Sequence, residues 1–363
     1  MTRVPRELWP IVYRFATSGD WPPRSDADVD AFFGFAKLER LLPLLMADPD
    51  VPAEVAAAKS RFRALDALYE KRYQLSRDAA LELQRIIGAH AFLFLKGSDY
   101  RYRLYARPRL RPMADIDIYV PARDFRAVLS RLAAAGNPRK YSDHGAAFAP
   151  GHHEVSIEID GVHVEPHRSF AQRVRARIDY EGLWQRREWF EHDGIRGYRL
   201  SPADAILCHA FYFAMDEFSS PLIRYLDFYL LLQQYEHELS DCAVRAKPWG
   251  IERPLFGALH VTTELFPSAR TKAVEDAMHL LLDAPTRRFL VDRVLPDPAT
   301  EPSGHVTGRR VQLWRKYSLM DQRWRSILLL AYHLYEVAIG SLIEWQTRRK
   351  GHLIPPRPTT RPR

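Results

Sequence analysis

Two aspartates two positions apart are the residues of this chain with the clearest chemical meaning. Asp115 and Asp117 lie at the start of the apolar run IDIYV at 116–120, which is typical of a buried β-strand. Side chains two apart on a strand project from the same face, so the carboxylates lie side by side. They repel each other unless a cation lies between them, and Mg²⁺ prefers carboxylate and phosphate oxygens. Alone, the pair is a weak signal, because most such pairs are solvated strand ends.

A second motif, Lys96-Gly97-Ser98, directly follows the apolar run AFLFL at 91–95, which also predicts a buried strand. A glycine there lets the backbone approach a ligand closely. The backbone amides, the hydroxyl and the ammonium group can then hold phosphate oxygens. In the alternative interpretation, Gly97 only turns the chain and Lys96 lies in solvent. A phosphate-type turn beside a metal-type carboxylate pair favours a site for a metal-bound phosphate compound.

The surrounding pattern predicts an α+β fold with a small mixed sheet between helical regions. The N-terminal region reads as helices, including one over 31–44, and Gly88 is placed to end a long helix. After the two strands, Asp160-Gly161 is a strong signal for a tight hairpin turn. Ser201-Pro202 has the residue types that begin a helix, and helices are expected from there onward.

The order of strand, Gly-Ser and then Asp-x-Asp on the next strand resembles the polymerase-beta-like nucleotidyltransferase superfamily. More narrowly, Lys96-Gly97 followed by RPMADIDIYV at 111–120 resembles the uncharacterised bacterial nucleotidyltransferase family proteins. The resemblance extends to a later predicted strand with a third acid before a histidine, Val164-Glu165-Pro166-His167, and to the helical segment 200–231.

This resemblance implies a two-metal transfer of a nucleoside monophosphate from an NTP, with ATP as the expected donor and pyrophosphate as the product. It implies that the catalytic and metal-binding residues are Asp115, Asp117 and Glu165, which would hold Mg²⁺ or Mn²⁺. The nucleotide-binding residues that it implies are Lys96, Gly97, Ser98 and Arg111, which would neutralise charge on the phosphates. The third acid departs from the commoner aspartate and is followed by a proline.

The spacing between the two motifs is longer than is usual in the superfamily, since 16 residues separate Ser98 from Asp115. Five arginines fall in this segment: Arg101, Arg103, Arg107, Arg109 and Arg111. We expect Arg111 to contact phosphate because it lies in the motif itself. An average member of the set is expected to be a solvated surface charge.

A different metal site can be drawn from the third-acid segment. His163, Glu165 and His167 alternate along one predicted strand, so they would share a face and form a His–Glu–His set. Same-face neighbours on a strand are about 6–7 Å apart, so three of them do not easily surround one ion. We therefore expect His163 and His167 to line the cleft or to form hydrogen bonds within it.

The resemblance also places polar residues inside the apolar helices that follow, namely His209, Arg224 and Asp227. An unpaired buried Asp227 would be costly, and Arg224, one turn earlier, is its expected partner. Their ion pair either fixes helix packing or helps to recognise the base or the acceptor.

The formal charge of +8 is concentrated at the C-terminal end, where six cations follow Gln346. The rest of the chain is nearly neutral, which predicts a small-molecule or peptide acceptor rather than a nucleic-acid end. We expect a cytoplasmic protein without a membrane span. The only two cysteines form no metal pattern, the N-terminus lacks a secretory signal, and the apolar segment 327–345 contains charged residues.

We thus predict four parts: an N-terminal helical segment (1–88), a nucleotidyltransferase core (89–200), a C-terminal helical domain (201–350) and a basic, proline-rich tail (351–363). Three alternatives to small-molecule transfer stay open. They are a protein-AMPylating enzyme, a non-catalytic nucleotide- or peptide-binding module, and an RNA-tailing enzyme that uses the basic tail. The sequence indicates no oligomeric state.

Overall fold

A computed structural model of the chain describes residues 5–17, 21–23, 25–135, 156–169, 175–296, 309–321 and 327. Residues 1–321 form one compact unit, and residues 322–363 form a second. The basic tail predicted at 351–363 and the part of the predicted helical domain after residue 321 lie outside the described residues, apart from residue 327.

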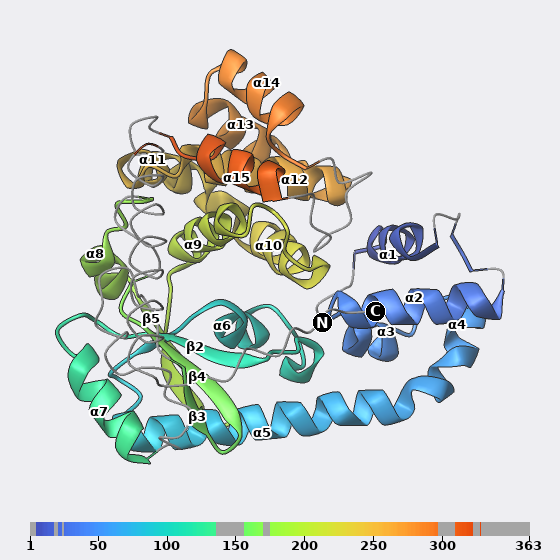
Figure 1. Ribbon diagram of the computed structural model, residues 1–363, viewed down its shortest axis with the longest axis horizontal. Helices are drawn as coiled ribbons and strands as arrows, with labels where there is room; N and C mark the ends of the chain where they lie inside the picture. The colour runs from blue at the N-terminus through green and yellow to red at the C-terminus, as the bar shows by residue number, and fades with distance from the viewer. Residues whose placement is uncertain are drawn as a thin grey trace, which may run out of the picture. The chain divides into compact units, whose positions relative to one another are not determined.

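The core of the first unit is a six-stranded mixed sheet, which confirms the expected α+β fold (Figure 1). Its strands are β1 (Leu93–Phe94), β2 (Asp115–Tyr119), β3 (Ile157–Ile159), β4 (Val162–His167), β5 (Glu188–His192) and β6 (Ile195–Arg199). Their order in space is β3-β4-β2-β1-β6-β5. Strand β1 pairs antiparallel with β2 and parallel with β6, and β2 pairs parallel with β4. The two predicted apolar strands, β1 and β2, are therefore neighbours inside the sheet.

Helices precede, connect and follow the strands. The N-terminal helices are α1 (Leu8–Thr17), α2 (Asp26–Leu38), α3 (Leu42–Ala47), α4 (Ala53–Ala58) and α5 (Arg63–Ile87). The helices within the sheet region are α6 (Lys96–Arg103), α7 (Phe125–Ala135) and α8 (Tyr180–Gln185). The C-terminal helices are α9 (Pro202–Met215), α10 (Leu222–Tyr235), α11 (Leu239–Trp249), α12 (Glu252–Leu265), α13 (Lys272–Leu281), α14 (Ala284–Arg293) and α15 (Arg309–Ser318).

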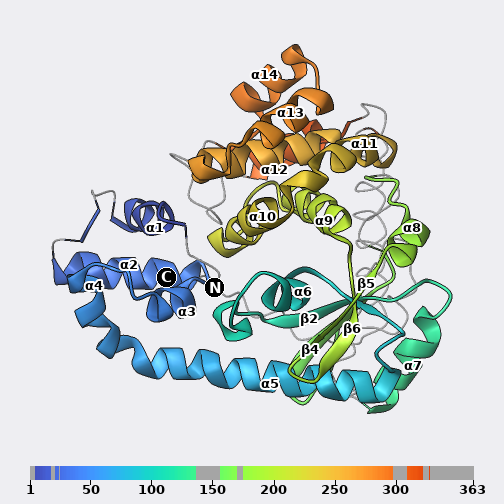
Figure 2. The same ribbon diagram turned by 180° about the vertical axis from the view of Figure 1, so that it is seen from behind.

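The two faces of the sheet have different partners. The long helix α5 runs along one face together with α7, as both views show (Figures 1 and 2). Ile116 and Ile118 of β2 point to that side and are buried with residues of both helices. Because side chains alternate along a strand, Asp115 and Asp117 lie on the opposite face, which α6 covers with α9 and α10 beyond it. The carboxylates therefore face the helical region.

Three of the predicted turn and cap signals are confirmed. The β3–β4 hairpin turns at Asp160 and Gly161, whose φ angles of 49° and 81° fit a tight two-residue turn. Gly88 ends α5 with a φ of 82°. The side chain of Ser201 caps α9 by accepting a hydrogen bond from the Asp204 amide.

The helix expected over 31–44 is wrong, because the chain breaks inside that range. Helix α2 ends at Leu38, and Arg40 follows with a φ of 61°, in the left-handed region. Pro43 lies in the first turn of α3, where the missing N–H of proline is tolerated. The periodic apolar pattern continues across the break because both helices bury their apolar side chains in the same core.

A second hairpin, β5–β6, completes the sheet and had no counterpart among the predicted strands. It turns at Asp193-Gly194, with φ angles of 50° and 79°, so the same signal that marked the first hairpin is present here. Among the described residues, no helix is long and apolar enough to cross a membrane. The apolar segment at 327–345 lies outside them, apart from Ile327.

Candidate active site

The pairing of β2 with β4 brings two of the three predicted acids, Asp117 and Glu165, together with His167. The two strands are parallel, and their register sets Asp115 opposite His163 and Asp117 opposite Glu165. Ligand atoms of Asp117, Glu165 and His167 all lie within 4.8 Å of one another. These three residues are up to 50 positions apart in the chain, yet one sheet face presents them as a cluster, and Asp115 on the same strand is not part of this set.

Asp117 is the most strongly held of these carboxylates. Its Oδ1 accepts a hydrogen bond from Lys96 Nζ at 2.7 Å and lies 2.8 Å from His167 Nε2. Burial alone would raise the pKa of Asp117, but Lys96 and His167 together hold it well below its ordinary value. Asp117 is therefore a fixed negative charge at any physiological pH.

Asp115 has the opposite electrostatic character. Burial, together with the negative charge of Asp117, raises the pKa of Asp115, and the more distant cations Lys96, Arg40 and Arg111 oppose this only in part. The two neighbouring aspartates therefore differ: one is compensated by its own cation and the other is not.

The Lys96-Gly97-Ser98 segment, predicted as a phosphate-type turn after the strand, forms the first turn of α6. Lys96 has a φ of 48° where the chain passes from strand to helix. The hydroxyl oxygen of Ser98 accepts a hydrogen bond from the Asp117 amide at 2.9 Å, which ties this turn to β2. A Cβ on Gly97 would lie 2.9 Å from Arg111 Nη1, so the close approach that the glycine allows is to a guanidinium.

Three of the five segment arginines, Arg101, Arg103 and Arg111, are buried. The surface position expected for an average member is therefore wrong for Arg101 and Arg103, whereas Arg111 was expected to contact phosphate. Arg101 donates to the hydroxyl of Ser76, and Arg103 forms an ion pair with Asp99, each at 2.9 Å. The segment between the motifs contains the end of α6 and a 3-10 turn, and Arg101 and Arg103 connect α6 to Ser76 of α5 and to the carbonyl oxygen of Leu200.

The expected pairing of Asp227 with Arg224 is also wrong. Asp227 accepts two-pronged hydrogen bonds from Arg111, with Nη2 2.6 Å from Oδ2, and a third from the hydroxyl of Tyr105. Arg224 instead pairs with Asp216. Asp216, in the turn before α10, lies within reach of Arg224. Asp227 instead points toward α6 and the segment that carries Arg111.

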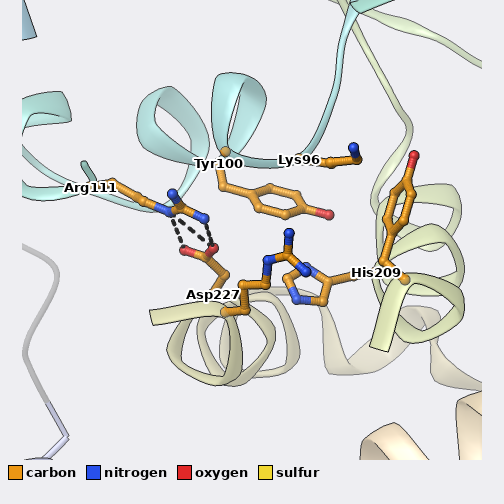
Figure 3. Close-up of a pocket in the computed structure, with 8 residues that line it drawn as sticks. Lys96, Tyr100, Arg111, His209 and Asp227 are labelled. Carbon is orange, nitrogen blue, oxygen red and sulfur yellow. Dashed lines mark hydrogen bonds and ion pairs between the residues drawn. The ribbon is translucent and has the colours of Figure 1, made fainter. Parts of the chain in front are cut away.

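A pocket separates α6 from helices α9 and α10 (Figure 3). It is lined by Lys96, Gly97, Tyr100, Arg111, His209, Tyr212, Arg224 and Asp227. In Figure 3, Lys96, Tyr100 and Arg111 come from the sheet side, and His209 and Asp227 from the helices. Burial, reinforced by Arg224 and Arg111, lowers the pKa of His209 well below its ordinary value, so this ring is neutral. The charged groups of the lining are thus three cations and one carboxylate.

The two histidines of β4 have separate environments. His167 is buried and contacts Asp117, which confirms the expectation of a hydrogen bond within the cleft. His163 is exposed, and its Nδ1 lies 3.0 Å from the hydroxyl of Ser156. His167 therefore belongs to the carboxylate cluster, and the sequence signal for it was its spacing of two from Glu165 on the same strand face.

Comparison with known families identifies the chain. The model of a family described as uncharacterised nucleotidyltransferases matches residues 25–267, more than half of the chain. The chain belongs to this family. No curated protein and no solved structure matches the sequence. The matched region of this nucleotidyltransferase family member contains the whole carboxylate cluster, the pocket lining and the α2–α3 break.

The donor set of the cluster fits a divalent metal ion. The carboxylates of Asp117 and Glu165 and the imidazole of His167 offer oxygen and nitrogen ligand atoms that lie within 4.8 Å of one another. Carboxylates suit Mg²⁺ and Mn²⁺, and an imidazole nitrogen adds affinity for Mn²⁺ and later transition metals. The Oδ2 atom of Asp117 accepts no hydrogen bond from the described residues, which leaves one oxygen available as a ligand.

Proposed function

We propose that this nucleotidyltransferase transfers AMP from ATP to a hydroxyl or amine of a small-molecule or peptide acceptor, in a metal-dependent reaction that releases pyrophosphate. The observation that carries this proposal is the β2–β4 register, which sets Asp117 opposite Glu165 and beside Asp115. The cations of α6 and of the pocket lie on the same side of the sheet. Negative groups for a metal and positive groups for phosphates therefore adjoin each other, as in polymerase-beta-like enzymes.

The bond changes define what each group must do. The acceptor oxygen or nitrogen forms a bond to the α-phosphorus, and the bond from that phosphorus to the bridging oxygen of the β-phosphate breaks. Asp115, Asp117, Glu165 and His167 would hold the metal. A divalent metal bound there supplies charge neutralisation for both the attacking and the departing oxygens.

The nucleotide-binding role falls to Lys96, Gly97, Ser98 and Arg111. The ammonium of Lys96 lies between Asp117 and the ring of Tyr212, 4.7 Å from the ring centroid. A metal cation bound to Asp117 would neutralise the charge of this carboxylate, and the Lys96 ammonium could then contact a phosphate. Arg111 keeps its carboxylate partner and closes the wall of the pocket.

The lining of the pocket favours a small-molecule or peptide acceptor over a nucleic acid. The described lining offers no row of aromatic side chains on which successive bases could stack. The two cysteines, Cys208 and Cys242, are free thiols, which supports a cytoplasmic location.

Transfer of label from ATP tests the proposal without knowledge of the acceptor. The protein is incubated with Mn²⁺, a cell extract, and ATP labelled at either the α- or the γ-phosphate, and low-mass and protein fractions are separated. We expect the α-label, but not the γ-label, to appear in a new low-mass compound distinct from ATP, ADP and AMP, while the γ-label is released as pyrophosphate. Asp117→Asn should form no such compound. Label in proteins would favour the AMPylating alternative, and transfer of the γ-label would exclude nucleotidyl transfer.

A further inference from the structure

The break between α2 and α3 places an arginine where the backbone favours glycine. Arg40 has a φ of 61°, a region that residues with a Cβ enter at an energetic cost and that glycine enters freely. Its side chain is exposed and, in the described part of the chain, forms no ion pair. Backbone strain of this kind persists where the surrounding structure enforces it, and it concentrates at functional sites.

The residue before it fixes this corner to the C-terminal helices. Glu39 is buried, and its carboxylate accepts a hydrogen bond from the Leu222 amide at 2.6 Å. Its carbonyl oxygen accepts a second from the Ile223 amide at 3.3 Å. These amides belong to the first turn of α10, where backbone N–H groups have no partner within the helix and a negative charge is favourable. Arg40 is therefore held next to the turn that carries Arg224.

The same corner also adjoins the segment that carries Arg111. Helix α3 packs against the 3-10 turn Pro108–Leu110, which ends directly before Arg111. In Figures 1 and 2, the α2–α3 corner lies beside the connection from α6 to β2 and close to α10. Two neighbouring segments thus bring two further arginines toward Arg40.

The electrostatics agree with this placement. Partial loss of water, followed by repulsion from Arg111 and Arg224, lowers the pKa of Arg40, while Asp115 opposes the shift. Arg111 and Arg224 each have a carboxylate partner, Asp227 and Asp216. Within the described part of the chain, Arg40 is the member of the three without such a partner.

We propose that Arg40 is a phosphate-binding residue that the N-terminal helical segment contributes to the active site, and that it contacts the β- and γ-phosphates of the bound nucleotide. This inference rests on the proposed nucleotidyl transfer. A polyphosphate beside Asp115 would relieve the repulsion among the three arginines, and a guanidinium can donate two parallel hydrogen bonds to one phosphate. The N-terminal segment would then be part of the site rather than only a support for it.

Arg40→Gly provides a clean test, because glycine accepts the local φ and should keep or raise the melting temperature. Calorimetry in Mn²⁺ measures the affinities of the full chain for ATP, pyrophosphate and AMP. We expect Arg40→Gly to bind ATP and pyrophosphate about tenfold or more weakly, as for loss of a charge-assisted hydrogen bond, and AMP unchanged. Arg40→Lys should lose less affinity for ATP and pyrophosphate, because lysine keeps the positive charge although it cannot donate two parallel hydrogen bonds to one phosphate.

Arg131→Ala is the matched control, since it removes an exposed arginine from α7, at the other end of the sheet. It should bind all three ligands as the unaltered protein does. Unchanged ATP and pyrophosphate affinity in Arg40→Gly would overturn the role of Arg40 and leave the proposed transfer intact. Failure of the unaltered protein to bind ATP or pyrophosphate would refute both.

Discussion

Arg111 and Asp227 form a buried ion pair between residues 116 positions apart in the chain. The guanidinium donates to both carboxylate oxygens, and the hydroxyl of Tyr105 donates to the same acid at 2.8 Å. Burial alone would lower the pKa of Arg111, but Asp227 raises it, so the pair stays charged. One wall of the pocket therefore depends on a contact between the sheet region and α10.

Removal of the acid from this pair should strongly destabilise the fold. Asp227→Asn leaves the guanidinium of Arg111 buried without a countercharge, and we expect a loss of about 3–5 kcal/mol in the free energy of unfolding. Asp216→Asn, which removes the partner of Arg224 at a more exposed position, should lose about 0–1 kcal/mol. Urea denaturation measures both, and equal losses would contradict the assigned difference.

The two motif aspartates should respond oppositely to the same substitution. Asp115→Asn removes a charge whose pKa is raised. A raised carboxyl pKa means that the folded state resists ionisation, so this charge destabilises the fold at neutral pH. We expect a higher melting temperature together with loss of nucleotidyl transfer.

Asp117→Asn removes a charge that Lys96 and His167 stabilise, so it should lower the free energy of unfolding by about 1.5–3 kcal/mol. It should also abolish transfer. Thermal unfolding of both variants in the absence of metal separates these expectations. A rise in melting temperature for Asp117→Asn would show that its partners contribute nothing.

His167 should control metal affinity, whether it binds the ion directly or orients Asp117. We expect His167→Gln to weaken Mn²⁺ binding about 10–100-fold, as for loss of a ligand's supporting contact. His163→Gln, on the same strand but exposed, should bind Mn²⁺ normally. Electron paramagnetic resonance titration of free Mn²⁺ gives both affinities. Equal affinities in the two variants would remove His167 from the site.

Stability should fall in mild acid because His209 is buried as a neutral ring. Its pKa is lowered by burial, with Arg224 and Arg111 adding to the effect, so below about pH 6.5 the unfolded chain binds a proton that the folded chain does not. We expect the free energy of unfolding to decrease from that pH downward, by at most about 1.4 kcal/mol per pH unit for one proton. In His209→Gln this decrease in the free energy of unfolding at low pH should be absent. Parallel plots of unfolding free energy against pH for the two proteins would show that His209 is not its source.

Local patterns predicted strands β1 to β4 and the shared face of the two motif aspartates, but not the β5–β6 hairpin. Alternation on β2 placed Asp115 and Asp117 on one face, and the Asp160-Gly161 turn fixed the position of β4, which carries Glu165. These features follow from residues within a few positions of each other. Local sequence patterns therefore predicted the nucleotidyltransferase family and the shared strand face of the two aspartates, while the roles of the site residues stay predictions.

The spacing of residues in the sequence does not reveal which distant segments come into contact in the fold. The cation nearest to Asp227 in the chain is Arg224, but in the folded protein Asp227 pairs with Arg111, and Arg224 pairs with Asp216. Arg103 looked like a surface charge because arginines are rarely buried, although its ion pair with Asp99 at spacing four was a local signal. The break at Arg40 was hidden because apolar residues continue in phase on both sides of it.

The position of β1 inside the sheet sets an order of assembly during synthesis. Leu93 pairs with Tyr119 of β2 and with Tyr198 of β6, so its two partners leave the ribosome at different times. At about 5–20 residues per second, the second partner arrives roughly 4–16 seconds after the first. By then β4 is complete, so the nascent chain holds β2 and β4, with their acids, next to the unpaired edge of β1. That interval is when incorrect strand pairing competes most directly with the native sheet.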